Sequence, residues 1–260
     1  TIAIDVIMPD GRTLQVASCH HYRDQWARAF DVKYEDESGN QQYVHQTTYG
    51  MSERLLGGIV ASHGDDRGLV MPPSVAPIQV VVIPIMAKDN SSNVVSESER
   101  ITNELKSSGI RARLDSRDIR PGQKYYDWEI KGVPLRIEVG PRDLANNSVM
   151  CARRTGGKES HSIVNLVETV HSELKSISLE MSKHSSSHFN SRIKQLPKFK
   201  REGSTLVFDQ DIEKGIVYEM AFDGNDAEAE IIEKNTDLSF LGDSTTPFES
   251  DVQCCITGKK

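Results

Sequence analysis

The run from Gln46 to Val60 constrains the fold more than any other stretch of the chain. A polar segment rich in β-forming residues ends at Gly50. Apolar residues then recur at helical spacing, at Met51, Leu55, Leu56, Ile59 and Val60. The pattern therefore predicts a strand that passes directly into a helix, with Ser52 and Arg54 at the junction.

Arg54 at this junction would be held on a rigid base. An arginine keeps its charge, and its flat guanidinium stacks on a purine while its edge donates to phosphate. The alternative is a solvated arginine in the first turn of a helix, which is the commoner meaning of an isolated Gly-x-Ser-x-Arg. A charged turn, a proline-rich segment and a buried apolar strand follow in residues 63–85, and they favour the nucleotide site.

Two motifs carry a resemblance to a known family. Gly50-Met-Ser-Glu-Arg54 looks like motif 3 of the class II aminoacyl-tRNA synthetases, whose arginine holds the adenine of ATP. The later run Pro-Pro-x-x-Ala-Pro-x-Gln-Val-Val resembles the passage into the anticodon-binding domain of prolyl-tRNA synthetases of the archaeal and eukaryotic type. The resemblance implies activation of proline by ATP to prolyl-adenylate, followed by transfer to tRNA(Pro).

The same resemblance divides the chain into three domains. We expect an α/β and α+β protein: residues 1–77 form the C-terminal part of a class II antiparallel-sheet catalytic domain. Residues 78–183 form an α/β anticodon-binding domain with mostly parallel strands and a long helix over 159–181. Residues 184–260 form a small α+β C-terminal domain. The chain shows neither motif 1 nor motif 2, so we expect the C-terminal portion of a ligase that is inactive alone.

The resemblance places an adenylate pocket near the start of the chain. Gln15-x-x-Ser18-Cys19-His20 occupies the place of the family's Gln-Gly-x-Thr-Ser-His. It implies that Gln15, Ser18 and Arg54 bind ATP or the adenylate, with Mg²⁺ accompanying ATP as substrate. His20 and Tyr49 would contact the proline. The chemistry needs positioning and charge neutralisation, so no residue is nominated as catalytic.

Other interpretations of these residues stay open. Adjacent histidines, His20 and His21, invite a metal site, but neighbours on a strand point to opposite faces. Tyr49 fits a packed tyrosine as well as a wall of the proline pocket. Asp65 and Asp66 fit the geometry of a loop better than a magnesium site.

Basic and aromatic residues alternate in the second part of the chain. Such a mixture suits single-stranded RNA, because cations bind phosphate while rings stack on bases. A charge-rich solvated surface explains the same composition. The run from Pro121 to Asp143 resembles the anticodon-binding domain closely. It implies that anticodon contacts come from Tyr125, Glu129, Arg136 and Lys158.

Composition bounds the remaining expectations. The formal net charge of −7 argues against indiscriminate nucleic-acid binding, and no apolar run is long enough to span a membrane. The four cysteines form no disulfide framework, which favours a cytoplasmic location. Relatives hold zinc through four cysteines near the C-terminus. Here these places fall on Asp223, Glu228, Cys255 and Thr257, so we expect no structural zinc.

The expected partners are tRNA(Pro), proline, ATP and a second copy that dimerises through the missing catalytic part, and no membrane. Two alternatives remain. One is a synthetase-derived accessory protein that binds tRNA, and the other is a different class II synthetase of the same subclass.

Overall fold

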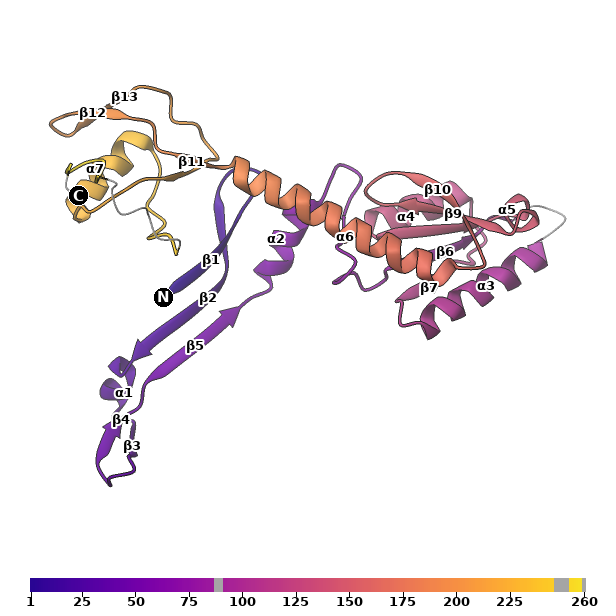
Figure 1. The fold of residues 1–260 in the computed structure, drawn as a ribbon, viewed down its shortest axis with the longest axis horizontal. Helices are drawn as coiled ribbons and strands as arrows, with labels where there is room; N and C mark the ends of the chain where they lie inside the picture. Colours follow the sequence, from indigo (N-terminus) through magenta and orange to yellow (C-terminus); the bar gives the residue numbers. More distant parts are fainter. Residues whose placement is uncertain (87–90, 246–252, 259–260) are drawn as a thin grey trace. The chain divides into compact units, whose positions relative to one another are not determined.

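A computed structural model describes residues 1–86, 91–245 and 253–258 of the chain (Figure 1). The chain divides into two compact units. The first unit comprises Thr1–Pro9 with Thr13–Ser186, and the second comprises Asp10–Arg12 with Ser187–Lys260. The finer division at residues 77 and 183 stays a prediction.

A three-stranded antiparallel sheet opens the first unit, in the order β1-β2-β5. Strand β1 pairs antiparallel with β2 as a hairpin. The predicted strand-to-helix passage is confirmed, since β5 leads into α2. The elements of this part are β1 (Ile2–Ile7), β2 (Thr13–Arg23), α1 (Gln25–Phe30), β3 (Lys33–Glu35), β4 (Gln41–Tyr43), β5 (Gln46–Met51) and α2 (Arg54–His63).

A five-stranded sheet follows, in the order β10-β9-β8-β6-β7. Strand β6 is parallel to β7 and β8, whereas β9 and β10 run antiparallel to their neighbours. The α/β class is confirmed, but the expectation of mostly parallel strands is wrong for the β9–β10 half. The elements are β6 (Val80–Pro84), α3 (Ser91–Ser107), β7 (Ala112–Leu114), α4 (Pro121–Ile130), β8 (Leu135–Val139), α5 (Pro141–Ala145), β9 (Ser148–Arg153), β10 (Lys158–Ser162) and α6 (Leu166–Ser191).

The two faces of this sheet carry separate cores. Val80, Val82 and Ile137 face the larger core, where α3 and α6 pack. Val81 and Ile83 face a smaller core together with Trp128 of α4. The successive residues of a strand point to opposite faces, which explains why the continuous apolar run of β6 is buried on both sides.

The long helix differs from its predicted bounds. Residues 159–162, predicted as its start, belong to the edge strand β10, which pairs with β9. Helix α6 begins at Leu166 and ends at Ser191, so it extends past the predicted end at residue 181 and includes the polar residues around 185. The residues of β10 are mostly exposed and those at the end of α6 are polar. Neither segment therefore has the apolar periodicity from which a strand or a helix is predicted.

The second unit is a small α+β body, as predicted. Leu206 and Ile232 are buried, and the rings of Phe199 and Phe208 lie 5.3 Å apart. No helix in the described ranges combines the length and apolar character that a membrane span requires. The elements are β11 (Ile193–Gln195), β12 (Phe199–Glu202), β13 (Thr205–Phe208), β14 (Val217–Glu219) and α7 (Asp226–Thr236).

Candidate functional site

The strand register brings two predicted anticodon residues into one row. Arg136 on β8 pairs with Ala152 on β9, and Ala152 pairs with Lys158 on β10. Directly paired residues point to the same face, so Arg136 and Lys158 flank the small Ala152 on the face of the sheet against which α4 packs. Helix α4 contributes the other two, Tyr125 and Glu129, one helical turn apart.

A residue that sequence reasoning missed joins three of the four. Glu138 lies two residues beyond Arg136 on β8 and therefore shares its face. Its carboxylate accepts hydrogen bonds from Arg136 Nε at 3.1 Å and Lys158 Nζ at 2.8 Å. The guanidinium carbon of Arg136 lies 4.0 Å from the centre of the Tyr125 ring. The alternation Arg-x-Glu in a predicted strand was the available signal.

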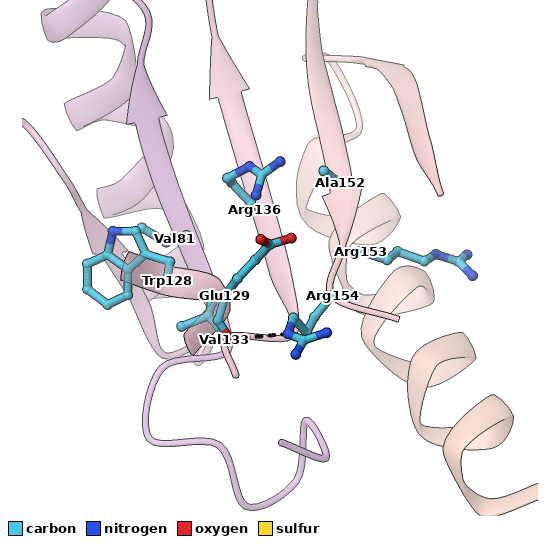
Figure 2. Close-up of a pocket in the computed structure, with 8 residues that line it drawn as sticks. All are labelled: Val81, Trp128, Glu129, Val133, Arg136, Ala152, Arg153 and Arg154. Carbon is cyan, nitrogen blue, oxygen red and sulfur yellow. Dashed lines mark hydrogen bonds between the residues drawn. The ribbon is translucent and has the colours of Figure 1, made fainter. Parts of the chain in front are cut away.

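Glu129 lies beside the same cluster. Figure 2 shows its carboxylate extending from α4 toward Arg136, at a hollow also lined by Val81, Trp128 and Arg154. The hollow measures about 30 Å³, which admits water but not a nucleobase. At its mouth, the carboxylate of Glu129 offers an acceptor and the guanidinium of Arg136 offers donors.

Helix α4 is held in place by a buried carboxylate at the end of β7. Asp115 is 3% exposed, and its side chain accepts hydrogen bonds from Trp128 Nε1 at 2.7 Å and Arg117 Nη2 at 2.7 Å. The buried Lys124 donates to the Asp115 carbonyl at 3.1 Å. Asp115 therefore fixes the helix that carries Tyr125 and Glu129.

Replacing Asp115 with asparagine should lower the free energy of unfolding at pH 7 by about 2 kcal/mol, because Trp128 and Arg117 lose a charged acceptor. Burial raises the pKa of Asp115, but the hydrogen bonds from Arg117 and Trp128 outweigh it and lower the pKa to about 2. A lowered folded pKa means that the stability is present above the unfolded value of about 3.9 and is lost as the pH falls through about 2.

Urea unfolding between pH 7 and pH 2 measures this effect. The difference between the wild type and Asp115→Asn should be constant down to about pH 4 and shrink below it. Asp127→Asn is the matched control, because Asp127 bonds the same Arg117 at 2.8 Å from a more exposed position. An equal loss in both variants would contradict the role of the buried carboxylate.

A β-bulge in β2 shapes the arrangement of the predicted adenylate residues. Ile4 pairs with Ala17 and Asp5 pairs with Gln15, so Val16 is an extra residue on β2. Simple alternation along β2 would place the Gln15 side chain on one face of the sheet and those of Ser18 and His20 on the other face. The bulge turns Gln15 onto their face, where His20 Nε2 and Ser18 Oγ lie 3.0 Å apart.

Helix α2 covers the opposite face of that sheet. A Cβ added at Gly58 would contact Val6 and Val16, which places the helix against their side. The face with Gln15, Ser18 and His20 therefore points away from α2, and its partly exposed polar groups can receive a ligand.

The structure separates Tyr49 from His20. Tyr49 on β5 pairs with Cys19, so it points to the face of α2, and it is 80% exposed. Arg54 is the first residue of α2 and is exposed, and its backbone N–H donates to Ser52 Oγ at 3.4 Å. The assignments of both residues stay predictions.

The region of the family's zinc ligands makes other contacts. Cys254 Sγ accepts backbone hydrogen bonds from Asp223 at 3.2 Å and Thr257 at 3.4 Å. Glu228 caps α7 by accepting from the Asn225 backbone at 3.0 Å. Within residues 1–86, 91–245 and 253–258, no group of three or more His, Cys, Asp or Glu side chains is arranged to hold a metal ion.

Comparison with known families identifies the domain that carries the cluster. Residues 79–173 match the family described as "Anticodon binding domain". They include Tyr125, Glu129, Arg136 and Lys158 as well as Glu138.

The whole chain aligns with the Thermococcus kodakarensis protein named "Proline--tRNA ligase", at 44% identity over 261 residues. This chain is a homologue of the proline–tRNA ligases. The ligase of Methanococcoides burtonii is 50% identical over 194 residues, which cover 74% of this chain and 40% of that ligase. The ligase of Pyrococcus abyssi is 54% identical over 154 residues, which cover 59% of this chain and 32% of that ligase.

The length of the match matters for function. The alignment covers all of this chain but 53% of the Thermococcus ligase. The chain therefore spans about half the length of the curated relatives that it matches over its full length, and it corresponds to the C-terminal portion of the proline–tRNA ligases.

Proposed function

We propose that this chain is the C-terminal portion of a proline–tRNA ligase and that it recognises the anticodon of tRNA(Pro). The observation that carries the proposal is the cluster on the α4 side of the five-stranded sheet. Arg136 and Lys158 donate to the Glu138 carboxylate there, the Tyr125 ring stacks on the Arg136 guanidinium, and Glu129 lies beside them. An arginine fork reads guanine O6 and N7, and carboxylates accept from base amino groups.

The whole enzyme would activate proline with ATP and transfer the prolyl group to tRNA(Pro). Gln15, Ser18 and Arg54 supply hydrogen-bond donors, which suits phosphate or adenine, whereas Mg²⁺ prefers carboxylate oxygens. His20 lies on the same face as Gln15 and Ser18, so the register supports its contact with the substrate. The register gives Tyr49 no such support. A proline contact by Tyr49 is a separate part of the proposal.

The remaining parts of the proposal concern the whole protein. It would act in the cytoplasm as a homodimer, with the dimer contact in the catalytic half that this chain does not include. The exposed apolar side chains around the three-stranded sheet favour a larger catalytic domain, because isolated domains rarely expose such surfaces. They include Ile2, Ile4, Met51 and Leu56.

The first test is binding of this chain to two tRNA transcripts at fixed salt, one with a proline anticodon and one with its two guanines changed. The wild type should prefer the proline anticodon, and Arg136→Ala should reduce that preference by about tenfold or more. Glu129→Ala should reduce it as well, because an acceptor for a base edge is lost. Fluorescence anisotropy measures each dissociation constant.

Arg100→Ala is the matched control, since it removes an exposed arginine from α3, which packs on the other face. It should weaken binding to both transcripts slightly and leave the preference unchanged. Equal, salt-sensitive binding of the wild type to both transcripts would contradict anticodon recognition. It would favour an accessory RNA-binding protein or a different class II synthetase.

A further inference from the structure

The cluster is built around the buried carboxylate of Glu138. Its side chain is 8% exposed, and burying a charge is costly unless it is paired and hydrogen-bonded. Its two oxygens have different partners: Oε1 accepts from Arg136 and Oε2 accepts from Lys158. Both of these partners are cations that are predicted to contact RNA, so Glu138 links the two.

The ionisation state of Glu138 supports this arrangement. Burial raises its pKa, but hydrogen bonds from Lys158 and Tyr125 and the charge of Arg136 outweigh the burial, so the pKa is lowered below its ordinary value. Glu138 is therefore ionised at neutral pH. In the same cluster, burial and the neighbouring charge of Glu138 raise the pKa of the Tyr125 hydroxyl, so it stays protonated as a donor.

Glu138 also determines how Arg136 is presented. The Nε of Arg136 is engaged by Glu138, and the guanidinium is stacked on Tyr125. Neither terminal nitrogen of Arg136 has a hydrogen-bond partner among the described residues. Those two nitrogens form the planar fork that binds guanine O6 and N7 in a bidentate manner.

We propose that Glu138 is a positioning residue for guanine recognition: it orients the fork of Arg136 and restrains Lys158, while Tyr125 supports the guanidinium plane. The inference rests on the proposed function and adds a residue to it. One face of the Tyr125 ring is then occupied by Arg136, so an anticodon base would have to stack on the other face.

The inference predicts effects of opposite sign on two RNAs. Glu138→Gln keeps the size of the side chain but removes its charge, so Arg136 and Lys158 lose their restraint. Binding to the altered anticodon should stay equal or become tighter, because phosphate meets one negative charge fewer. Binding to the proline anticodon should weaken, and the preference should fall by about tenfold or more. A folding defect would weaken both.

The experiment measures both dissociation constants at fixed salt, and the melting temperature, for the wild type, Glu138→Gln and Glu138→Asp. Aspartate keeps the charge and should recover part of the lost preference. Glu159→Gln is the matched control, because Glu159 is an exposed carboxylate next to Lys158 on β10. It should leave the preference unchanged.

The outcomes separate the inference from the proposed function. A wild type without any preference overturns the proposed function and the role of Glu138 with it. A wild type with a preference that Glu138→Gln retains overturns only the role of Glu138. A parallel loss of both affinities with a lower melting temperature, or no recovery in Glu138→Asp, also overturns it. If Glu138→Gln does not fold, full wild-type preference in Glu138→Asp overturns it.

Discussion

Replacing Arg154 with alanine should lower the free energy of unfolding of the chain by about 3 kcal/mol. The Arg154 side chain is 1% exposed and donates to both carboxylate oxygens of Asp65. It also donates to the carbonyls of Glu129 at 3.2 Å and Gly68 at 3.3 Å. Truncation removes all the hydrogen bonds that Arg154 donates to these acceptors, and these bonds join the segment after α2 to the end of α4.

The size of this effect is limited by water. The side chain of Asp65 is 39% exposed, so solvent replaces part of what Arg154 supplies. Arg154→Lys should keep less than half of the stabilisation, because an ammonium group cannot reach four acceptors from one plane. Chemical denaturation measures each variant, with Arg100→Ala as the exposed control at less than about 1 kcal/mol. Equal losses for Arg154→Ala and Arg100→Ala would contradict the prediction.

The pH dependence offers a second readout for Arg154. The hydrogen bond from Arg154 holds the pKa of Asp65 well below its usual range. The wild type therefore gains stability above the unfolded value of about 3.9 and loses it as the pH falls below that value. Arg154→Ala should lose less on acidification, because the bond that lowers the pKa is absent.

Much of the fold was predictable because one-sided burial leaves a pattern in the sequence. The helix α2 and the buried strand β6 follow directly from helical spacing and from a continuous apolar run. The edge strand β10 did not, because its residues are mostly exposed and polar. The direction of β9 and β10 was unpredictable for a related reason: direction is set by pairing with distant strands.

The candidate site was predictable only in its individual residues. The resemblance named Tyr125, Glu129, Arg136 and Lys158, but not the carboxylate of Glu138 that three of them share. A charged residue in a strand is normally expected to face solvent. Only the strand register shows that Glu138 lies next to Arg136 and Lys158. The bulge at Val16 is similarly invisible, because an extra residue leaves no mark in an alternating pattern.

The largest backbone effect is expected where the segment after α2 passes the end of α4. Leu69 N–H donates to the Ile130 carbonyl at 3.1 Å, and Met71 N–H donates to the Gly132 carbonyl at 3.2 Å. Gly132 has a φ of +69°, and a Cβ added to it would lie 2.8 Å from the carbonyl carbon and oxygen of Leu69. Backbone atoms cannot move aside as a flexible side chain does.

Gly132→Ala should therefore cost about 3 kcal/mol of unfolding free energy, part from the left-handed conformation and part from the clash with Leu69. Gly109→Ala separates the two terms, because Gly109 has a similar φ of +81° and a Cβ added there meets nothing within 4 Å. It should cost about 1 kcal/mol, the conformational part alone. Urea unfolding of both variants measures the difference, and equal costs would show that the close approach of residues 69–71 to α4 contributes nothing.

Because Glu129 lies three residues before Gly132, the same substitution should also weaken the anticodon preference, whereas Gly109→Ala should leave it intact.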